Sequence, residues 1–266
     1  QIKDKDIEPE DCQIKLFGIK KLKFFRKVKD SAFTEVVKRV LHICKIDSVT
    51  GLQQYAWPAL LRGHNVFGVG PREKGGKTLA YVPPLVTMLH QKDSYRNLPV
   101  SCGPHALIMA ANIQKAADVH RYLMRFREED ICFRLILLSA ENNEAVAEIE
   151  LLNGCDVLIA TPLCLLRMLS KGVTNLAGVC HLIFDDLDML QESYSDQIEE
   201  IMSLYRKVIS ERSESVVAPS QMIAMSSNYN GDVERFYKTN FMEPVIIVAS
   251  QLEAAYAANV KQVNTD

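Results

Sequence analysis

Residues 65 to 78 read NVFGVGPREKGGKT, and the character of the chain changes twice within this short stretch. Residues 65 to 69 have the apolar character and length of a buried strand, whereas the glycines that follow favour a tight turn. The turn ends in Gly76-Lys77-Thr78 and leads into an apolar stretch of helical length. In such a loop, backbone N–H groups face phosphate oxygens, the lysine contacts them, and the threonine hydroxyl binds Mg²⁺. The stretch therefore predicts a site for a nucleotide and Mg²⁺.

The loop departs from the usual phosphate-binding pattern at two positions. Pro71 stands five residues before Gly76, where the pattern has glycine. Lys74 lies inside the turn, where a side chain obstructs the close backbone approach that glycine permits. Two interpretations of Lys74 remain open: an added phosphate contact, or a surface lysine on a distorted loop.

Strand patterns and helix patterns alternate along the rest of the chain. Short apolar runs of strand length occupy residues 65–69, 106–110, 132–138, 156–160, 180–184, 221–225 and 245–248. Amphipathic helical patterns occupy residues 114–126, 144–152 and 194–209. Buried strands separated by helices predict an α/β fold with a doubly wound parallel sheet. Ligands of such sheets bind beyond the carboxyl ends of the strands, so we expect the functional residues in those loops.

Composition excludes several classes of protein. The chain has 266 residues, of which 48% are hydrophobic and 24% charged, and its net charge of −2 indicates that any nucleic-acid contact is local. Its seven cysteines form no CxxC pair, which argues against zinc and favours a reducing, intracellular compartment. The longest apolar run is too short for a bilayer, so no membrane partner is expected. Because the chain begins with Gln1, we expect it to be part of a longer protein.

Residues 1–30 differ in composition from the rest and are predicted to be an N-terminal extension. An acidic start precedes a basic stretch that contains Phe17, Phe24 and Phe25. Basic and aromatic residues together could bind RNA through phosphate pairing and base stacking. The interpretation we favour is a solvated extension whose phenylalanines pack on the domain.

Six segments carry a family resemblance, and they follow one another in a fixed order. These are residues 52–58, 71–78, 110–116, 156–162, 182–190 and 221–228. They resemble the Q motif, the phosphate loop, motif Ia, the Thr-Pro-Gly-Arg motif, the Asp-Glu-Ala-Asp motif and the Ser-Ala-Thr motif of the DEAD-box RNA helicase family. The resemblance implies a single RecA-like domain of the P-loop NTPase class over residues 31–249. Residues 250–266 resemble the interlobe linker and the start of a second lobe.

The resemblance also implies a role for each matching residue, with ATP and Mg²⁺ as cofactors. Adenine and phosphate contacts are implied for Gln53, Lys74, Gly75, Gly76, Lys77 and Thr78. Metal binding falls to Thr78 and Asp185, and catalysis to Asp185 and Asp186. Contacts with single-stranded RNA are implied for Thr161 and Pro162, and coupling to the second RecA-like lobe for Asp188 and Ser226.

Several positions depart from the family pattern and put parts of this chemistry in doubt. Asp186 replaces the glutamate that positions attacking water and is one methylene shorter, which would misplace a general base. Ile46 stands where an aromatic stacks on adenine. Ile113 replaces the arginine of motif Ia, residues 163–164 read Leu-Cys instead of Gly-Arg, and the Ser-Ala-Thr motif ends in Asn228.

Two functional hypotheses follow. The first is the ATP-binding lobe of an ATP-dependent RNA helicase, whose isolated form is inactive or weak because the second lobe supplies arginine contacts. The second is a catalytically weak, helicase-like scaffold that binds RNA or protein. A RecA ATPase of DNA repair or recombination fits less well, because the Gln53 segment and the Ser226 motif resemble DEAD-box proteins.

The style of the departures is similar to that of DEAD-box domains joined to Tudor domains in the germline piRNA pathway. This resemblance implies a role in piRNA biogenesis and transposon silencing, with PIWI and Tudor proteins as partners. The implied location is the cytoplasm, in germline RNA granules.

Overall fold

A computed structural model describes most of the chain. The described residues are 14–19, 22, 24–72, 76–91, 95, 98, 103–127, 131–140, 144–212 and 218–249. Lys74 and Gly75, which we expect at the phosphates, and residues 250–266, which we expect to begin a second lobe, lie outside them. No helix among the described residues is long and apolar enough to cross a bilayer.

One sheet organises the described residues, and its eight strands run in the order β1-β8-β2-β7-β6-β3-β5-β4. Only β1 is antiparallel to its neighbour, and the other pairings are parallel. The strands are β1 (Lys15–Phe17), β2 (Val66–Val69), β3 (Ala106–Ala110), β4 (Leu135–Leu138), β5 (Val157–Ala160), β6 (His181–Asp185), β7 (Gln221–Ser226) and β8 (Val245–Val248). The mixed α/β fold with a mostly parallel sheet confirms the expected fold class.

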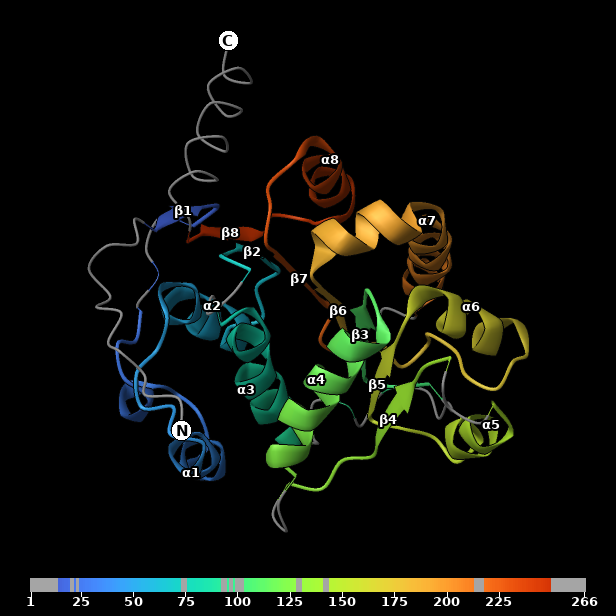
Figure 1. Ribbon diagram of the computed structural model, residues 1–266, viewed down its shortest axis with the longest axis horizontal. Helices are drawn as coiled ribbons and strands as arrows, with labels where there is room; N and C mark the ends of the chain where they lie inside the picture. Colours follow the sequence, from blue (N-terminus) through green and yellow to red (C-terminus); the bar gives the residue numbers. More distant parts are fainter. Residues whose placement is uncertain are drawn as a thin grey trace.

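Helices cover both faces of the sheet (Figure 1). One face carries α1 (Glu35–Ile43), α2 (Gly51–Leu61), α3 (Lys77–His90) and α4 (Ile113–Arg125). The opposite face carries α5 (Glu144–Leu152), α6 (Pro162–Ser170), α7 (Leu187–Glu211) and α8 (Gly231–Asn240). A short 3₁₀ turn, η2 (Val28–Asp30), precedes α1. The sheet therefore separates two apolar cores, as continuous apolar strands require.

Element boundaries differ from the sequence prediction in two places. The strand expected at 132–138 begins only at Leu135, and the helix expected at 194–209 begins at Leu187. Tyr194 lies inside α7 with a non-helical backbone (φ −143°, ψ 30°), which divides the helix at a kink. That kink interrupts the helical spacing of apolar residues, so the pattern shows only the part beyond it.

Part of the segment expected to be an extension belongs to the domain. β1 pairs with β8 and forms that edge of the sheet, and both Leu22 and Val28 are buried in the core. The ring of Phe24 lies 5.4 Å from that of Tyr55, centroid to centroid. These contacts favour the interpretation in which the aromatic residues pack on the domain.

Two consecutive prolines sit inside α3, the helix that follows the phosphate loop. Pro83 and Pro84 have no N–H, so neither can donate to the carbonyl one turn earlier. For Pro83 that carbonyl belongs to Leu79, and the indole Nε1 of Trp57 donates to it instead (2.9 Å). Trp57 is fully buried. A side chain of α2 thus replaces one of the two donors that α3 loses to its prolines, and it ties α2 to the helix that follows the phosphate loop.

Replacing Trp57 tests this bond. We expect Trp57→Phe to lower the free energy of unfolding by about 2–4 kcal/mol, because it removes volume from the core and leaves the Leu79 carbonyl without a donor. Urea unfolding monitored by circular dichroism measures the change.

The matched control restores the donor inside the helix. In a Pro83→Ala background, the new N–H can bond to the Leu79 carbonyl, so Trp57→Phe should cost about 1–2 kcal/mol less there. An equal cost in both backgrounds would contradict the role of the indole N–H.

Candidate nucleotide-binding site

The described part of the phosphate loop ends at a glycine that no other residue can replace easily. Gly76 has a left-handed backbone (φ 65°), and a Cβ built there would lie 2.3 Å from Nε2 of Gln53 and 3.0 Å from Oγ1 of Thr50. Gly76 is the N-cap of α3, whose first turn carries Lys77 and Thr78. The loop therefore places both side chains of Gly-Lys-Thr at a helix N-terminus, where anions bind.

Gln53, expected to read adenine, lies against this loop. Its Nε2 donates to the carbonyl of Gly76 (3.1 Å), and its Oε1 accepts from the backbone N–H of Thr50 (3.1 Å) in a capping box. The residue is 2% exposed. The glutamine therefore ties α2 to the phosphate loop, and only its remaining amide hydrogen and lone pair are available to a base.

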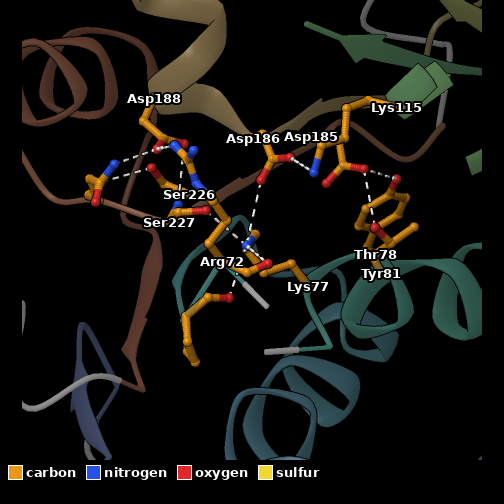
Figure 2. A network of polar contacts seen from close by, with 12 residues as sticks. Arg72, Lys77, Thr78, Tyr81, Lys115, Asp185, Asp186, Asp188, Ser226 and Ser227 are labelled. Carbon is orange, nitrogen blue, oxygen red and sulfur yellow. Dashed lines mark hydrogen bonds and ion pairs between the residues drawn. The ribbon is translucent and has the colours of Figure 1, made fainter. Parts of the chain in front are cut away.

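Lys77 is buried and makes polar contacts with three parts of the chain (Figure 2). Its Nζ donates to the carbonyl of Pro71 (3.0 Å) and to Oγ of Ser227 (2.9 Å). It also lies 3.5 Å from Oδ1 of Asp186. The lysine expected to bind phosphate thus also contacts groups of the protein.

Asp185 closes β6 and points toward α3 (Figure 2). Its Oδ2 accepts from Thr78 Oγ1 and from the hydroxyl of Tyr81, both at 3.2 Å. Burial first, and then the charge of Asp186, raise the pKa of Asp185 from 3.8 to about 6. The structure thus brings together the two residues expected to hold Mg²⁺, and it adds Tyr81, which the motif analysis did not single out.

Asp186 follows in a left-handed conformation (φ 57°, ψ 60°) at the N-cap of α7. This backbone turns its carboxylate away from that of Asp185 and toward Lys77 and Lys115 (Figure 2). Nζ of Lys115 lies 2.6 Å from Oδ2, which is the shortest polar contact that Asp186 makes with the described residues. The other oxygen, Oδ1, is buried and accepts no hydrogen bond within the described chain.

Asp188, expected to couple the lobes, joins the loop after β6 to the loop after β7. Its Oδ1 accepts from the backbone N–H of Ser227 (3.2 Å), and its Oδ2 accepts from Nδ2 of Asn228 (2.8 Å). Arg72 lies at 4.0 Å on its other side. Ser226 is buried, and its hydroxyl donates to the carbonyl of Asn228 (2.7 Å). The asparagine that ends this motif therefore takes part in the same network.

A groove of about 600 Å³ lies over these residues. Its wall includes Gln53, Lys77, Thr78 and Asp186, together with Ile46. Ile46 is partly buried and packs against the core. The site expected for adenine thus has an aliphatic wall, with no stacking ring at that position.

Thr161 and Pro162, expected to contact RNA, lie at the end of β5, two strands away from β6. Thr161 is the N-cap of α6, yet its hydroxyl makes no capping bond, and Pro162 begins the helix. The next side chain, Leu163, is 55% exposed. Pro162 is buried, so Thr161 and Leu163 are the accessible side chains here, at the same edge of the sheet as the nucleotide site but separate from the cluster around Asp185 and Asp186.

Motif comparison missed the contact between Lys115 and Asp186. Lys115 stands where the DEAD-box pattern has leucine, so no motif marks it. The available signal is positional, because Lys115 lies in the first turn of the helix after β3, and β3 pairs with β6. Only the sheet order brings that turn next to Asp186.

The residues present suit a hard cation beside phosphates. Thr78 and Asp185 offer oxygen ligands, and the buried Oδ1 of Asp186, which accepts no hydrogen bond from the described residues, offers another acceptor to a water or a cation. Mg²⁺ together with a nucleotide triphosphate fits this donor set.

Known proteins resemble the chain over most of its length. It is 29% identical over 244 residues to a human protein described as putative ATP-dependent RNA helicase TDRD12, and 27% identical over 224 residues to the Bombyx mori protein of the same description. The matches cover 91% and 84% of this chain, but only 20% and 12% of those proteins. The ATP-dependent RNA helicase dbp2 of Schizosaccharomyces pombe is 23% identical over 256 residues, which is 44% of its length.

Solved structures show the same fold. The yeast DEAD-box splicing factor Prp28 superimposes with a TM-score of 0.77 at 19% identity, over 89% of this chain and 54% of that structure. Prp28 from Chaetomium thermophilum, bound to ADP, superimposes with a TM-score of 0.72 over 90% and 54%. The model of the DEAD/DEAH box helicase family matches residues 50–236, which include every described site residue named above except Ile46. The chain therefore belongs to the DEAD/DEAH box helicase family.

Proposed function

We propose that this chain is the ATP-binding, first RecA-like lobe of an ATP-dependent RNA helicase. The observation that carries the proposal is the pairing of Thr78 with Asp185, whose oxygens lie 3.2 Å apart at the N-terminus of α3. Lys77 and Thr78 both line the groove described above. Since the chain spans only a fraction of its curated relatives, the activity of the whole protein is part of the proposal.

Each side chain has a defined task in this proposal. Thr78 and Asp185 hold Mg²⁺, which when bound neutralises charge on the phosphates. Lys77 exchanges the Pro71 carbonyl and Ser227 for phosphate oxygens, since a charged partner is stronger than neutral ones. Asp186, one methylene shorter than the glutamate typical of the family, orients a water through Oδ1 once Lys77 has moved to the phosphates.

RNA binding is assigned to the ends of β3 and β5. The hydroxyl of Thr161 makes no capping bond and is available to a phosphate oxygen, and the N-termini of α4 and α6 point the same way. The second RecA-like lobe completes both sites, with Asp188 and Ser226 coupling the two lobes through the loop after β7. Turnover by this lobe alone is therefore expected to be weak.

A helicase-like scaffold is the second candidate, and specific contacts favour it. Lys77 and Asp186 are already paired within the protein, Gln53 is tied to the backbone, and Ile46 provides no ring for adenine. In that case the fold binds RNA or protein, and nucleotide turnover is slow or absent. Nucleotide titration separates the two candidates.

The biological setting follows from resemblance alone. The similarity to the TDRD12 proteins supports a role in piRNA biogenesis and transposon silencing, with PIWI and Tudor proteins as partners in cytoplasmic germline granules. Co-purification with a co-expressed PIWI protein is the measurement for this part.

Nucleotide binding is the first prediction. We expect a fluorescent ATP analogue with Mg²⁺ to bind this chain, and Lys77→Ala to weaken binding at least about tenfold, because a charge-assisted bond to phosphate is lost. Lys171→Ala, in an exposed ion pair on α6, is the control and should bind as the unmodified chain does. Failure of the unmodified chain to bind at millimolar analogue would rule out the ATP-binding proposal and leave the scaffold.

We expect the charge of Asp185 to lower the free energy of unfolding while it supports Mg²⁺-dependent binding. Its raised pKa means that the folded state disfavours the ionised carboxylate, so Asp185→Asn should stabilise the fold at pH 7 by about 1–3 kcal/mol. The same variant should lose Mg²⁺-dependent binding of the analogue. Urea unfolding and the titration measure the two effects.

The pH dependence has a definite sign. Between pH 4 and pH 6 the Asp185 carboxyl binds more protons in the folded state than in the unfolded state, so its contribution to stability becomes less unfavourable as pH falls. The advantage of Asp185→Asn should therefore shrink from pH 6 and be absent by about pH 4. Asp232→Asn, at an exposed position of α8, should show no such trend. If Asp185→Asn is less stable than the unmodified chain at pH 7, the raised pKa assigned to Asp185 is contradicted.

The RNA surface has its own test. Thr161→Val preserves shape and removes the hydroxyl, so we expect single-stranded RNA to bind about three- to tenfold more weakly, with unchanged unfolding. Fluorescence anisotropy at low salt measures this, and Ser170→Ala, at the far end of α6, serves as the control. Unchanged affinity for Thr161→Val would remove Thr161 from the RNA site.

A further inference from the structure

A lysine in the first turn of α4 points at the catalytic carboxylates rather than into solvent (Figure 2). Asn112 caps this helix, and Lys115 occupies the third helical position. A positive charge at a helix N-terminus is unfavourable, because the aligned peptide dipoles are positive there. The helix dipole therefore disfavours Lys115 at this position, and a nearby anion must offset that electrostatic cost.

Asp186 is that anion. Nζ of Lys115 lies 2.6 Å from Oδ2 of Asp186, whose side chain is 4% exposed, while that of Lys115 is 36% exposed. Burial lowers the pKa of Lys115, but its hydrogen bond to Asp186 and the charge of that carboxylate outweigh burial and raise it. A buried carboxylate without a cation is strongly destabilising, so this contact satisfies both partners.

The other lysine cannot serve both Asp186 and a nucleotide. Lys77 is 3.5 Å from Oδ1 of Asp186 and is the residue assigned to phosphate. When Lys77 turns to phosphate, Lys115 is the cation that stays with Asp186. Asp185 differs, because its oxygen accepts only from the hydroxyls of Thr78 and Tyr81 among its described hydrogen-bond partners.

We propose that Lys115 is a resident counter-ion of Asp186, so that the site holds nucleotide phosphates with less dependence on a divalent cation than a site with leucine there. The proposal rests on the nucleotide-binding function. Its physical basis is that two buried carboxylates repel phosphates when no cation is present, and Lys115 cancels one of those charges. By the same charge, Lys115 weakens the attraction of the nucleotide-free site for a divalent cation.

The main experiment compares the affinity for a fluorescent ATP analogue in Mg²⁺ with that in excess chelator. The ratio of the two dissociation constants should rise about tenfold in Lys115→Leu, chiefly through weaker binding in chelator. Lys115→Arg keeps the charge and should retain the ratio of the unmodified chain. Lys171→Leu removes a lysine from an exposed ion pair and should also retain it. An unchanged ratio in Lys115→Leu overturns the proposal.

A second measurement does not need nucleotide. Mn²⁺ binding to the nucleotide-free chain, followed by the paramagnetic resonance signal of free Mn²⁺, should tighten about tenfold in Lys115→Leu. Adding Asp186→Asn should abolish the gain, because one carboxylate is removed. Thermal unfolding of each variant shows whether it is folded. Equal Mn²⁺ affinities in the folded variants would overturn the proposal.

The two measurements distinguish the two proposals. If no variant binds the analogue but Mn²⁺ binding tightens as expected, the nucleotide function fails and the counter-ion assignment stands. If the analogue binds but neither the ratio nor the Mn²⁺ affinity changes, the nucleotide function stands and Lys115 is only a structural partner of Asp186.

Discussion

Two neighbouring carboxylates, Asp185 and Asp186, are buried at the end of β6, and the protein must compensate both charges in a place from which water is largely excluded. It does so by different means. Asp185 receives two hydroxyl hydrogen bonds from α3, whereas Asp186 turns through a left-handed backbone toward two lysines. Helix α3, the loop after β7 and the first turn of α4 are all held by this requirement.

The same constraint explains how the site can lose family residues and remain connected. Asn228 ends the Ser-Ala-Thr motif, yet it donates to Asp188 and keeps the loops after β6 and β7 together. Gln53 fastens α2 to Gly76, and Trp57 donates to the Leu79 carbonyl that Pro83 leaves without a backbone donor. The framework around the Gly-Lys-Thr turn is therefore well supported, whereas Ile46 offers an aliphatic side chain where the family pattern has an aromatic one. The supporting contact of Gln53 is thus present only a few residues from Ile46, where the aromatic of the family pattern is replaced.

Sequence periodicity located most strands well because those strands are continuous runs buried on both faces, as in β3 and β8. It was less accurate where burial did not follow the pattern. Residues 132–134 are apolar in part but precede the ladder, and the kink at Tyr194 hid the first turns of α7. β1 is short and pairs only at the sheet edge, so its three residues carry no periodic signal.

The sequence by itself determined the order of elements, the Gly-Lys-Thr turn and the family, since these depend on local patterns and on motifs read in order. It also named Gln53, Lys77, Thr78, Asp185, Asp186, Asp188 and Ser226, all of which meet at one edge of the sheet. Only the tertiary structure showed that Lys115 contacts Asp186 and that Tyr81 contacts Asp185. Both contacts depend on the strand order, which places β3 and the helix after β2 beside β6. A long-range ion pair of this kind leaves no local pattern, because its two residues are neighbours only after the sheet has formed.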